Sequence, residues 1–121
     1  MNDLEDPAYW KALVNMGLSK FFILRVLHTG PSHGYLVLEK LAEFTAGCCV
    51  PTYGTIYPIL KELVEGGYAQ VSTETVGGRQ RKVYGLTAKG DRAYCNAVRV
   101  WREVIPYLTR VVVENGEDTR G

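Results

Sequence analysis

Apolar residues recur every three or four positions through most of the chain, which is the spacing of one face of an α-helix. At the start of the chain this spacing predicts a short helix that ends at Gly17 and has Pro7 in its first turn. A second helix over residues 18–29, with Ser19 as its cap, is so apolar that other elements must surround it. After a turn, residues 35–47 should form a third, amphipathic helix.

The second half of the chain begins with a fourth helix, which Thr52 can cap and which a pair of glycines ends. Two β-rich runs follow at residues 69–75 and 82–86, and a glycine-containing loop joins them, so they should form a hairpin. Thr87 then caps a long last helix. The apolar positions of this helix have heptad spacing and are Tyr94, Ala97, Trp101, Val104, Leu108 and Val111.

This order of elements predicts a winged helix-turn-helix, a mainly α fold with a small β-hairpin wing (α+β), extended at both ends by dimerisation helices. The expected organisation is an N-terminal helical arm at 1–17, a winged helix-turn-helix DNA-binding domain at 18–87, a C-terminal dimerisation helix at 88–113 and a flexible tail at 114–121.

Composition narrows the class of protein. The chain has 121 residues, of which 46% are hydrophobic, and a net charge of +1, so one domain is expected and any polyanion site must be local. No apolar run has membrane-helix length and the acidic start is no signal peptide, so we expect a soluble, cytoplasmic protein. No carboxylate pair, nucleophile motif or P-loop is present, which argues against an enzyme and a cofactor.

The second helix of a helix-turn-helix places its first residues in the major groove of DNA. Here these residues are Thr52, Tyr53, Thr55 and Tyr57, whose hydroxyls can bond phosphates or base edges, and Lys61 one turn later can reach a phosphate. The alternative is a solvated helix start with two half-buried tyrosines, since the region lacks the Arg, Asn and Gln residues that usually read bases.

The hairpin favours DNA binding over that alternative. Residues 77–92 carry a net charge of +4, whereas the rest of the chain carries −3. Arg79, Arg81 and Lys82 fall on the wing, where a cationic surface is typical of a nucleic-acid contact. His33 precedes the third helix, where a DNA backbone could pass. A winged helix that serves only as a protein-interaction module is the competing hypothesis, but such a wing need not be cationic.

Four stretches resemble the PadR family of winged-helix transcriptional regulators: residues 30–35 (GPSHGY), 51–63 (PTYGTIYPILKEL), 66–68 (GGY) and 78–90 (GRQRKVYGLTAKG). With the apolar helix before them, they extend the resemblance over residues 18–90. It implies a dimeric repressor that binds a double-stranded DNA operator, with Tyr53, Thr55 and Tyr57 on the recognition helix and residues 79–82 on the wing. Gln80 and Val83 stand where the family often has Pro and Tyr.

A single helix after the wing is similar to the short branch of this family. In multidrug-binding members of that branch a tryptophan of the last helix stacks on planar drugs, and Trp101 stands at the matching distance, with Tyr94 beside it. The resemblance thus implies a planar aromatic effector at the interface of a homodimer; the alternative is that Trp101 is an interface core residue. The expected interface residues are Trp10, Leu13, Val14, Ala97, Trp101, Val104 and Leu108.

The neighbouring thiols Cys48 and Cys49 leave a third hypothesis open, a thiol-based metalloid or redox-sensing repressor. Two ligands do not make a zinc site, and Cys95 lies far along the chain, so no metal site is expected. The competing interpretation is that these cysteines are small loop and core residues.

Overall fold

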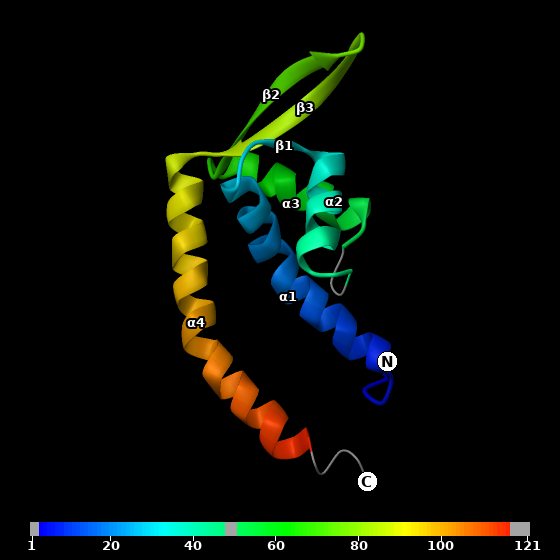
Figure 1. Ribbon diagram of the computed structural model, residues 1–121, viewed down its shortest axis with the longest axis vertical. Helices are drawn as coiled ribbons and strands as arrows, with labels where there is room; N and C mark the ends of the chain where they lie inside the picture. Colours follow the sequence, from blue (N-terminus) through cyan, green and yellow to red (C-terminus); the bar gives the residue numbers. More distant parts are fainter. Residues whose placement is uncertain (1–2, 48–50, 117–121) are drawn as a thin grey trace.

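The computed structural model describes residues 3–47 and 51–116. In these residues the elements follow the order α1 (Pro7–His28), β1 (Ser32–His33), α2 (Gly34–Phe44), α3 (Tyr53–Glu65), β2 (Ala69–Val76), β3 (Arg79–Leu86) and α4 (Ala88–Gly116). The pair α2 and α3 forms the helix-turn-helix, and β2 and β3 form a hairpin that extends beyond the helices (Figure 1). The predicted combination of helices with a β-hairpin wing is confirmed.

The N-terminal helix differs from the prediction: where two helices were expected, the structure has one continuous helix, α1. Asp6 caps α1 by accepting the backbone N–H of Ala8, and Pro7 occupies the first turn. Ser19 is not a cap: its hydroxyl donates to the carbonyl of Asn15 one turn earlier, which a serine inside a helix commonly does. The helix therefore continues through Gly17 and Leu18, across the boundary expected between arm and DNA-binding domain.

The hydrophobic core lies where α1, α2 and α3 meet. Its fully buried side chains come from all three helices and are Ile23, Val37, Leu41, Ile56 and Leu60. The base of the hairpin joins this core through Ala69 and Tyr84, whereas residues 70–82 are exposed. The core thus fixes the helix-turn-helix and the base of the wing, and leaves the outer wing free to meet a partner.

The sheet has three antiparallel strands in the order β1-β3-β2. The two-residue strand β1 was not predicted; Ser32 pairs with Tyr84 and His33 with Val83 of β3. The turn between β2 and β3 is also shorter than predicted, since only Gly77 and Gly78 lie between the strands. Their φ angles of 58° and 78° suit a tight hairpin turn of this length, so Arg79 and Arg81 lie on a regular strand.

Helix α4 begins at Ala88, directly after the predicted cap Thr87. The Thr87 hydroxyl accepts the N–H of Gly90 and donates to the carbonyl of Gly67. It runs to Gly116, so residues 114–116 of the predicted tail are helical. The N-terminal part of α1 and the C-terminal part of α4 project away from the sheet (Figure 1). No helix in the described parts of the chain is long and apolar enough to cross a membrane.

Candidate nucleic-acid interface

A row of exposed aromatic rings runs from the start of α2 to the start of α3. The ring of Tyr53 lies between those of Tyr35 and Tyr57, with centroid distances of 6.3 and 5.9 Å, and His33 extends the row from Tyr35 at 6.4 Å. The three tyrosines are between 41% and 56% exposed. Tyr35 was not among the predicted DNA-binding residues, and the signal that points to it is its place directly after the turn that contains His33.

Two phenols of this row, those of Tyr35 and Tyr53, have a raised pKa and stay neutral at neutral pH. A hydrogen bond to Glu39, and then the negative charge of Glu39, raise the pKa of Tyr35 above its ordinary value. Partial desolvation raises the pKa of Tyr53 as well. The Tyr35 hydroxyl donates its hydrogen to Glu39, whereas the protonated phenol of Tyr53 can donate to a phosphate oxygen or to a base-edge acceptor. The row therefore suits the surface of a nucleic acid at its α3 end.

The base of the wing borders this row. A hollow of about 290 Å³ is lined by residues of the α2 start, α3 and β3, namely His33, Gly34, Tyr35, Tyr57, Arg81, Lys82 and Tyr84. A Cβ atom at Gly34 would lie 2.7 Å from the hydroxyl oxygen of Tyr57, so any larger residue at this position would displace the Tyr57 ring. The structure thus brings His33, Tyr57, Arg81 and Lys82 of the predicted DNA-binding set together.

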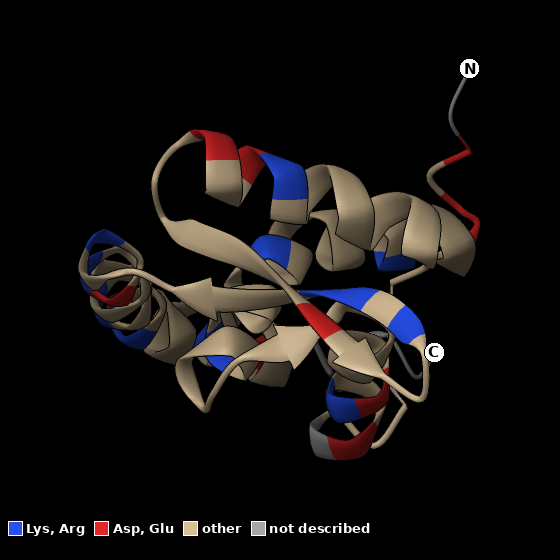
Figure 2. Ribbon diagram, turned by 90° about the horizontal axis from the view of Figure 1, so that it is seen from above, with Lys and Arg blue, Asp and Glu red and all other residues tan. Residues whose placement is uncertain are grey.

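Arg79 and Arg81 lie two residues apart on β3 and share one face of the strand. In the view from above, the wing shows a blue stretch on β3 beside one red segment on β2 (Figure 2). Glu74 is the acidic residue of β2, and it is paired with Arg81 across the hairpin. Arg79 and Lys82 are paired with the uncharged Val76 and Thr73. The wing therefore keeps a net positive charge, although Glu74 offsets one of its three positive charges.

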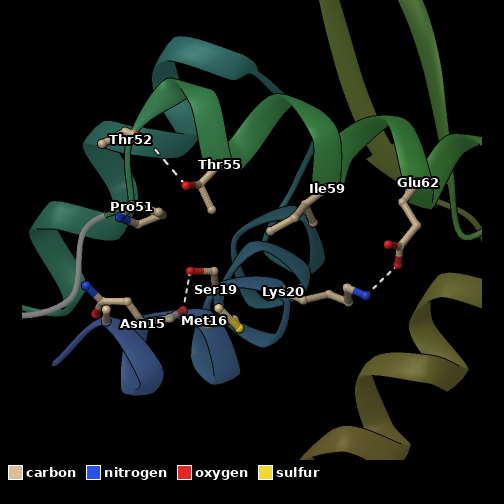
Figure 3. Close-up of a pocket in the computed structure, with 10 residues that line it drawn as sticks. Asn15, Met16, Ser19, Lys20, Pro51, Thr52, Thr55, Ile59 and Glu62 are labelled. Carbon is tan, nitrogen blue, oxygen red and sulfur yellow. Dashed lines mark hydrogen bonds and ion pairs between the residues drawn. The ribbon is translucent and has the colours of Figure 1, made fainter. Parts of the chain in front are cut away.

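The structure separates Thr52 and Thr55 from the tyrosine row. Both line a groove of about 500 Å³ between α3 and α1, opposite Asn15 and Ser19 (Figure 3). Thr52 occupies the predicted cap position, but its side chain makes no capping hydrogen bond and lies 3.4 Å from the hydroxyl of Thr55. Its carbonyl oxygen accepts the backbone N–H groups of Thr55 and Ile56, both at 3.0 Å.

The far end of the same groove is closed by an ion pair between Lys20 of α1 and Glu62 of α3, at 2.5 Å. Lys61 points elsewhere: its side chain is 76% exposed and lies 4.0 Å from Glu65. An exposed pair at that distance contributes little to stability, so Lys61 remains available to an external anion.

Comparison with known proteins decides the family. The model of the transcriptional regulator PadR-like family matches residues 23–96, more than half of the chain. The chain belongs to this family. No match was found among the curated proteins.

Solved structures of PadR-family and other transcriptional regulators share the fold. A transcriptional regulator from Clostridium thermocellum superimposes with a TM-score of 0.74 at 23% identity, over 80% of this chain and 95% of its own. A PadR family regulator from Eggerthella lenta gives 0.76 at 20% identity, over 87% and 90%. Bacillus subtilis PadR, solved in complex with operator DNA, gives 0.62 at 27% identity, over 67% of this chain and 46% of that one.

In this PadR-like chain the predicted ligand residues Tyr94 and Trp101 are already in contact with α1. The ring of Phe21 stacks on both, with centroid distances of 5.9 Å and interplanar angles of 22°. Tyr94 also stacks on His28 at 4.6 Å and lies within hydrogen-bond reach of Arg25. Sequence reasoning missed Phe21, because nothing in the spacing along the chain indicates which helix faces Trp101.

The predicted interface residues form two exposed apolar surfaces on the projecting ends. On α1, Trp10, Leu13 and Val14 are 51%, 42% and 50% exposed; on α4, Val104 and Leu108 are 43% and 52% exposed. Ala97 is half-buried. Further exposed apolar side chains continue the α4 surface and are Ile105, Tyr107, Val111, Val112 and Val113.

Cys48 and Cys49 lie outside the described residues. Cys95 is free and exposed on α4. Among the residues that the structure describes, no three His, Cys, Asp or Glu side chains are placed to hold a metal ion.

Proposed function

We propose that this PadR-like chain is a sequence-specific regulator of transcription that binds double-stranded DNA. The observation that carries the proposal is the meeting of a cationic wing with an exposed row of tyrosines at one hollow. Helix α3 would enter the major groove and expose Tyr53 and Tyr57 to it, while Arg79, Arg81 and Lys82 would contact phosphates. Lys61 and His33 complete the proposed contact surface, and the exposed Thr52 and Thr55 border it from the groove beside α1. The structure of Bacillus subtilis PadR in complex with operator DNA supports DNA as the partner.

The active form in this proposal is a homodimer. Exposed apolar side chains gather on α1 and α4, and on α4 Val104, Leu108 and Val111 share one face by their heptad spacing. Apolar surfaces of this kind mark protein–protein interfaces. A second copy of the chain fits them because a twofold axis would pair the same side chains on both subunits. The two recognition helices would then read half-sites about one helical turn apart, ~34 Å, in an inverted repeat.

The proposed regulator acts as a repressor that a planar aromatic molecule releases from DNA. Twofold symmetry places the Trp101 rings of both subunits at one interface, each with Phe21 on one side. A planar ligand would stack on the remaining ring faces, near Tyr94. Because α4 follows directly after β3 and Thr87, a shift of α4 would move the wing and the recognition helix, and with them the half-site spacing.

Selection of DNA tests the proposal. Duplexes enriched from a random pool by the purified protein should share an inverted repeat, and hydroxyl-radical cleavage should show protection of backbone on one face of each half-site. The variant Tyr53→Ala should enrich a less defined sequence, whereas Lys11→Ala on the distant arm should enrich the same repeat. Failure to enrich any duplex would favour the protein-interaction module over the regulator.

A further inference from the structure

The imidazole of His33 has one ring nitrogen committed to α2. Its Nδ1 accepts the backbone N–H of Leu36 at 3.3 Å, which closes the first turn of the helix. An acceptor nitrogen carries no hydrogen, and a neutral imidazole has one N–H and one acceptor. In the neutral form the proton of His33 is therefore on Nε2.

The nitrogen that carries this proton faces another donor. The Nε2 atom lies 3.2 Å from Nη1 of Arg81, and a guanidinium group offers only donors. The opposite tautomer would let Nε2 accept from Arg81, but it would place a hydrogen on Nδ1 against the N–H of Leu36. With these two partners alone, neither tautomer satisfies both contacts. An external acceptor between Nε2 and Nη1 satisfies all of them.

The sheet holds the two donors in place. His33 belongs to β1 and pairs with Val83, two residues after Arg81 on the neighbouring strand β3. Both donors line the hollow that Lys82 and Tyr57 also border, and no carboxylate is among the described residues that line it. No described Asp or Glu lies within ion-pair distance of Arg81 or Lys82. The hollow thus presents fixed donors and positive charge.

We propose that His33 and Arg81 together hold one phosphate group of the DNA backbone, with Nε2–H and Nη1–H donating to it. The inference rests on the proposed function, and deepens it by assigning a shared contact. A phosphate suits the hollow because its oxygens accept several hydrogen bonds and its charge strengthens each of them. One phosphate would thereby connect the start of α2 with the wing, and fix the position of both on the duplex.

The pair is tested with three substitutions on a duplex enriched by the parent protein. His33→Asn keeps a residue that caps helices well but removes the Nε2 donor. Arg81→Ala removes the guanidinium, and Arg79→Ala serves as the matched control because it removes the same charge from the same strand face outside the hollow. His33→Asn and Arg81→Ala should each weaken binding by about tenfold, the usual effect of losing a hydrogen bond to a charged group.

The double variants decide whether the phosphate is shared. His33→Asn with Arg81→Ala should lose less affinity than the product of the two single losses, since neither residue holds the phosphate well alone. His33→Asn with Arg79→Ala should lose the full product. Equal, multiplicative losses in both pairs would overturn the shared contact.

Replacement of single backbone phosphates by neutral methylphosphonates locates the contact. Replacement of one particular phosphate should weaken DNA binding by the parent, but should have little effect on binding by His33→Asn or by Arg81→Ala. If the two variants were insensitive to different phosphates, the proposal would be overturned. Two-bond ¹H–¹⁵N spectra of the free parent should show the Nε2–H tautomer of His33, and the Nδ1–H tautomer would contradict the proposal. The chain has two histidines, so His33 is assigned from the spectrum of a His28→Gln variant. These spectra and the scan with Arg81→Ala keep the test open if His33→Asn does not fold.

The proposed function and the shared phosphate contact can fail separately. A parent that enriches and binds no duplex contradicts the proposed function and the phosphate contact with it. A parent that binds its duplex, but whose His33→Asn and Arg81→Ala losses multiply, contradicts the shared phosphate alone.

Discussion

The substitution Leu108→Ala on α4 should weaken the dimer without unfolding the chain. The Leu108 side chain is 52% exposed in the single chain, so about half of its surface remains to be buried by a partner. Full burial of a leucine contributes about 1.5–3 kcal/mol, and half of it therefore about 1 kcal/mol. A twofold interface contains the residue twice, which gives about 2 kcal/mol, or roughly a 30-fold higher dissociation constant.

Sedimentation equilibrium over a range of protein concentrations measures this constant. Thr109→Ala is the matched control, because the neighbouring side chain is exposed but lies outside the heptad positions. Alanine is favourable in helices, so neither variant should disturb α4 itself. A parent that sediments as a folded monomer, or a Leu108→Ala variant with the dissociation constant of the parent, would refute the proposed interface.

Three further predictions concern the effector, the helix contact and the tyrosine row. Planar aromatic compounds should quench tryptophan fluorescence and release DNA. Trp101→Ala should lose both effects and keep its DNA affinity, and release from that variant would exclude this site as the sensor. Gly34→Ala should displace the Tyr57 ring, since its Cβ would lie 2.7 Å from the hydroxyl, and should weaken DNA binding by about tenfold, the effect of losing a hydrogen bond to a charged group, while circular dichroism still shows a helical fold; unchanged binding would contradict a role for the position of the Tyr57 ring in the DNA contact. Glu39→Gln should lower the pKa of Tyr35 towards its ordinary value, because Glu39 raises it, so absorbance titration should show a phenol ionising at lower pH, and an unchanged curve would contradict that influence.

The sequence predicted the elements whose signals are local. The hairpin follows from two β-rich runs around glycines, and the cap at Thr87 from a hydroxyl before a helical pattern; both are present. The cationic wing follows from charge clustering within sixteen positions, which needs no knowledge of the fold.

The wrong predictions have physical causes that local sequence patterns do not show. Ser19 has the residue type of a helix cap, but it is buried inside a continuous helix and its hydroxyl donates to the carbonyl of Asn15. The strand β1 has two residues and exists only through its pairing with β3, so no periodicity marks it.

The contacts that define the candidate sites are tertiary and lie far apart in the chain. Phe21 meets Trp101 across α1 and α4, and His33 meets Arg81 across the sheet. Helix periodicity predicted that Thr55 lies on the recognition helix, but it could not predict that Thr55 lies on the side of that helix that faces α1. Which residues of a surface act together therefore becomes visible only in the structure.

The salt dependence of DNA binding tests the central claim most directly. Each phosphate contact by a cation releases counterions, so the double variant Arg79→Ala with Arg81→Ala should bind all duplexes more weakly and flatten the slope of log affinity against log salt by about one to two units. Arg99→Ala with Arg102→Ala removes the same charge from α4 outside the wing and should leave the slope near that of the parent. A wing variant with unchanged affinity and slope would contradict the proposal that the wing binds DNA.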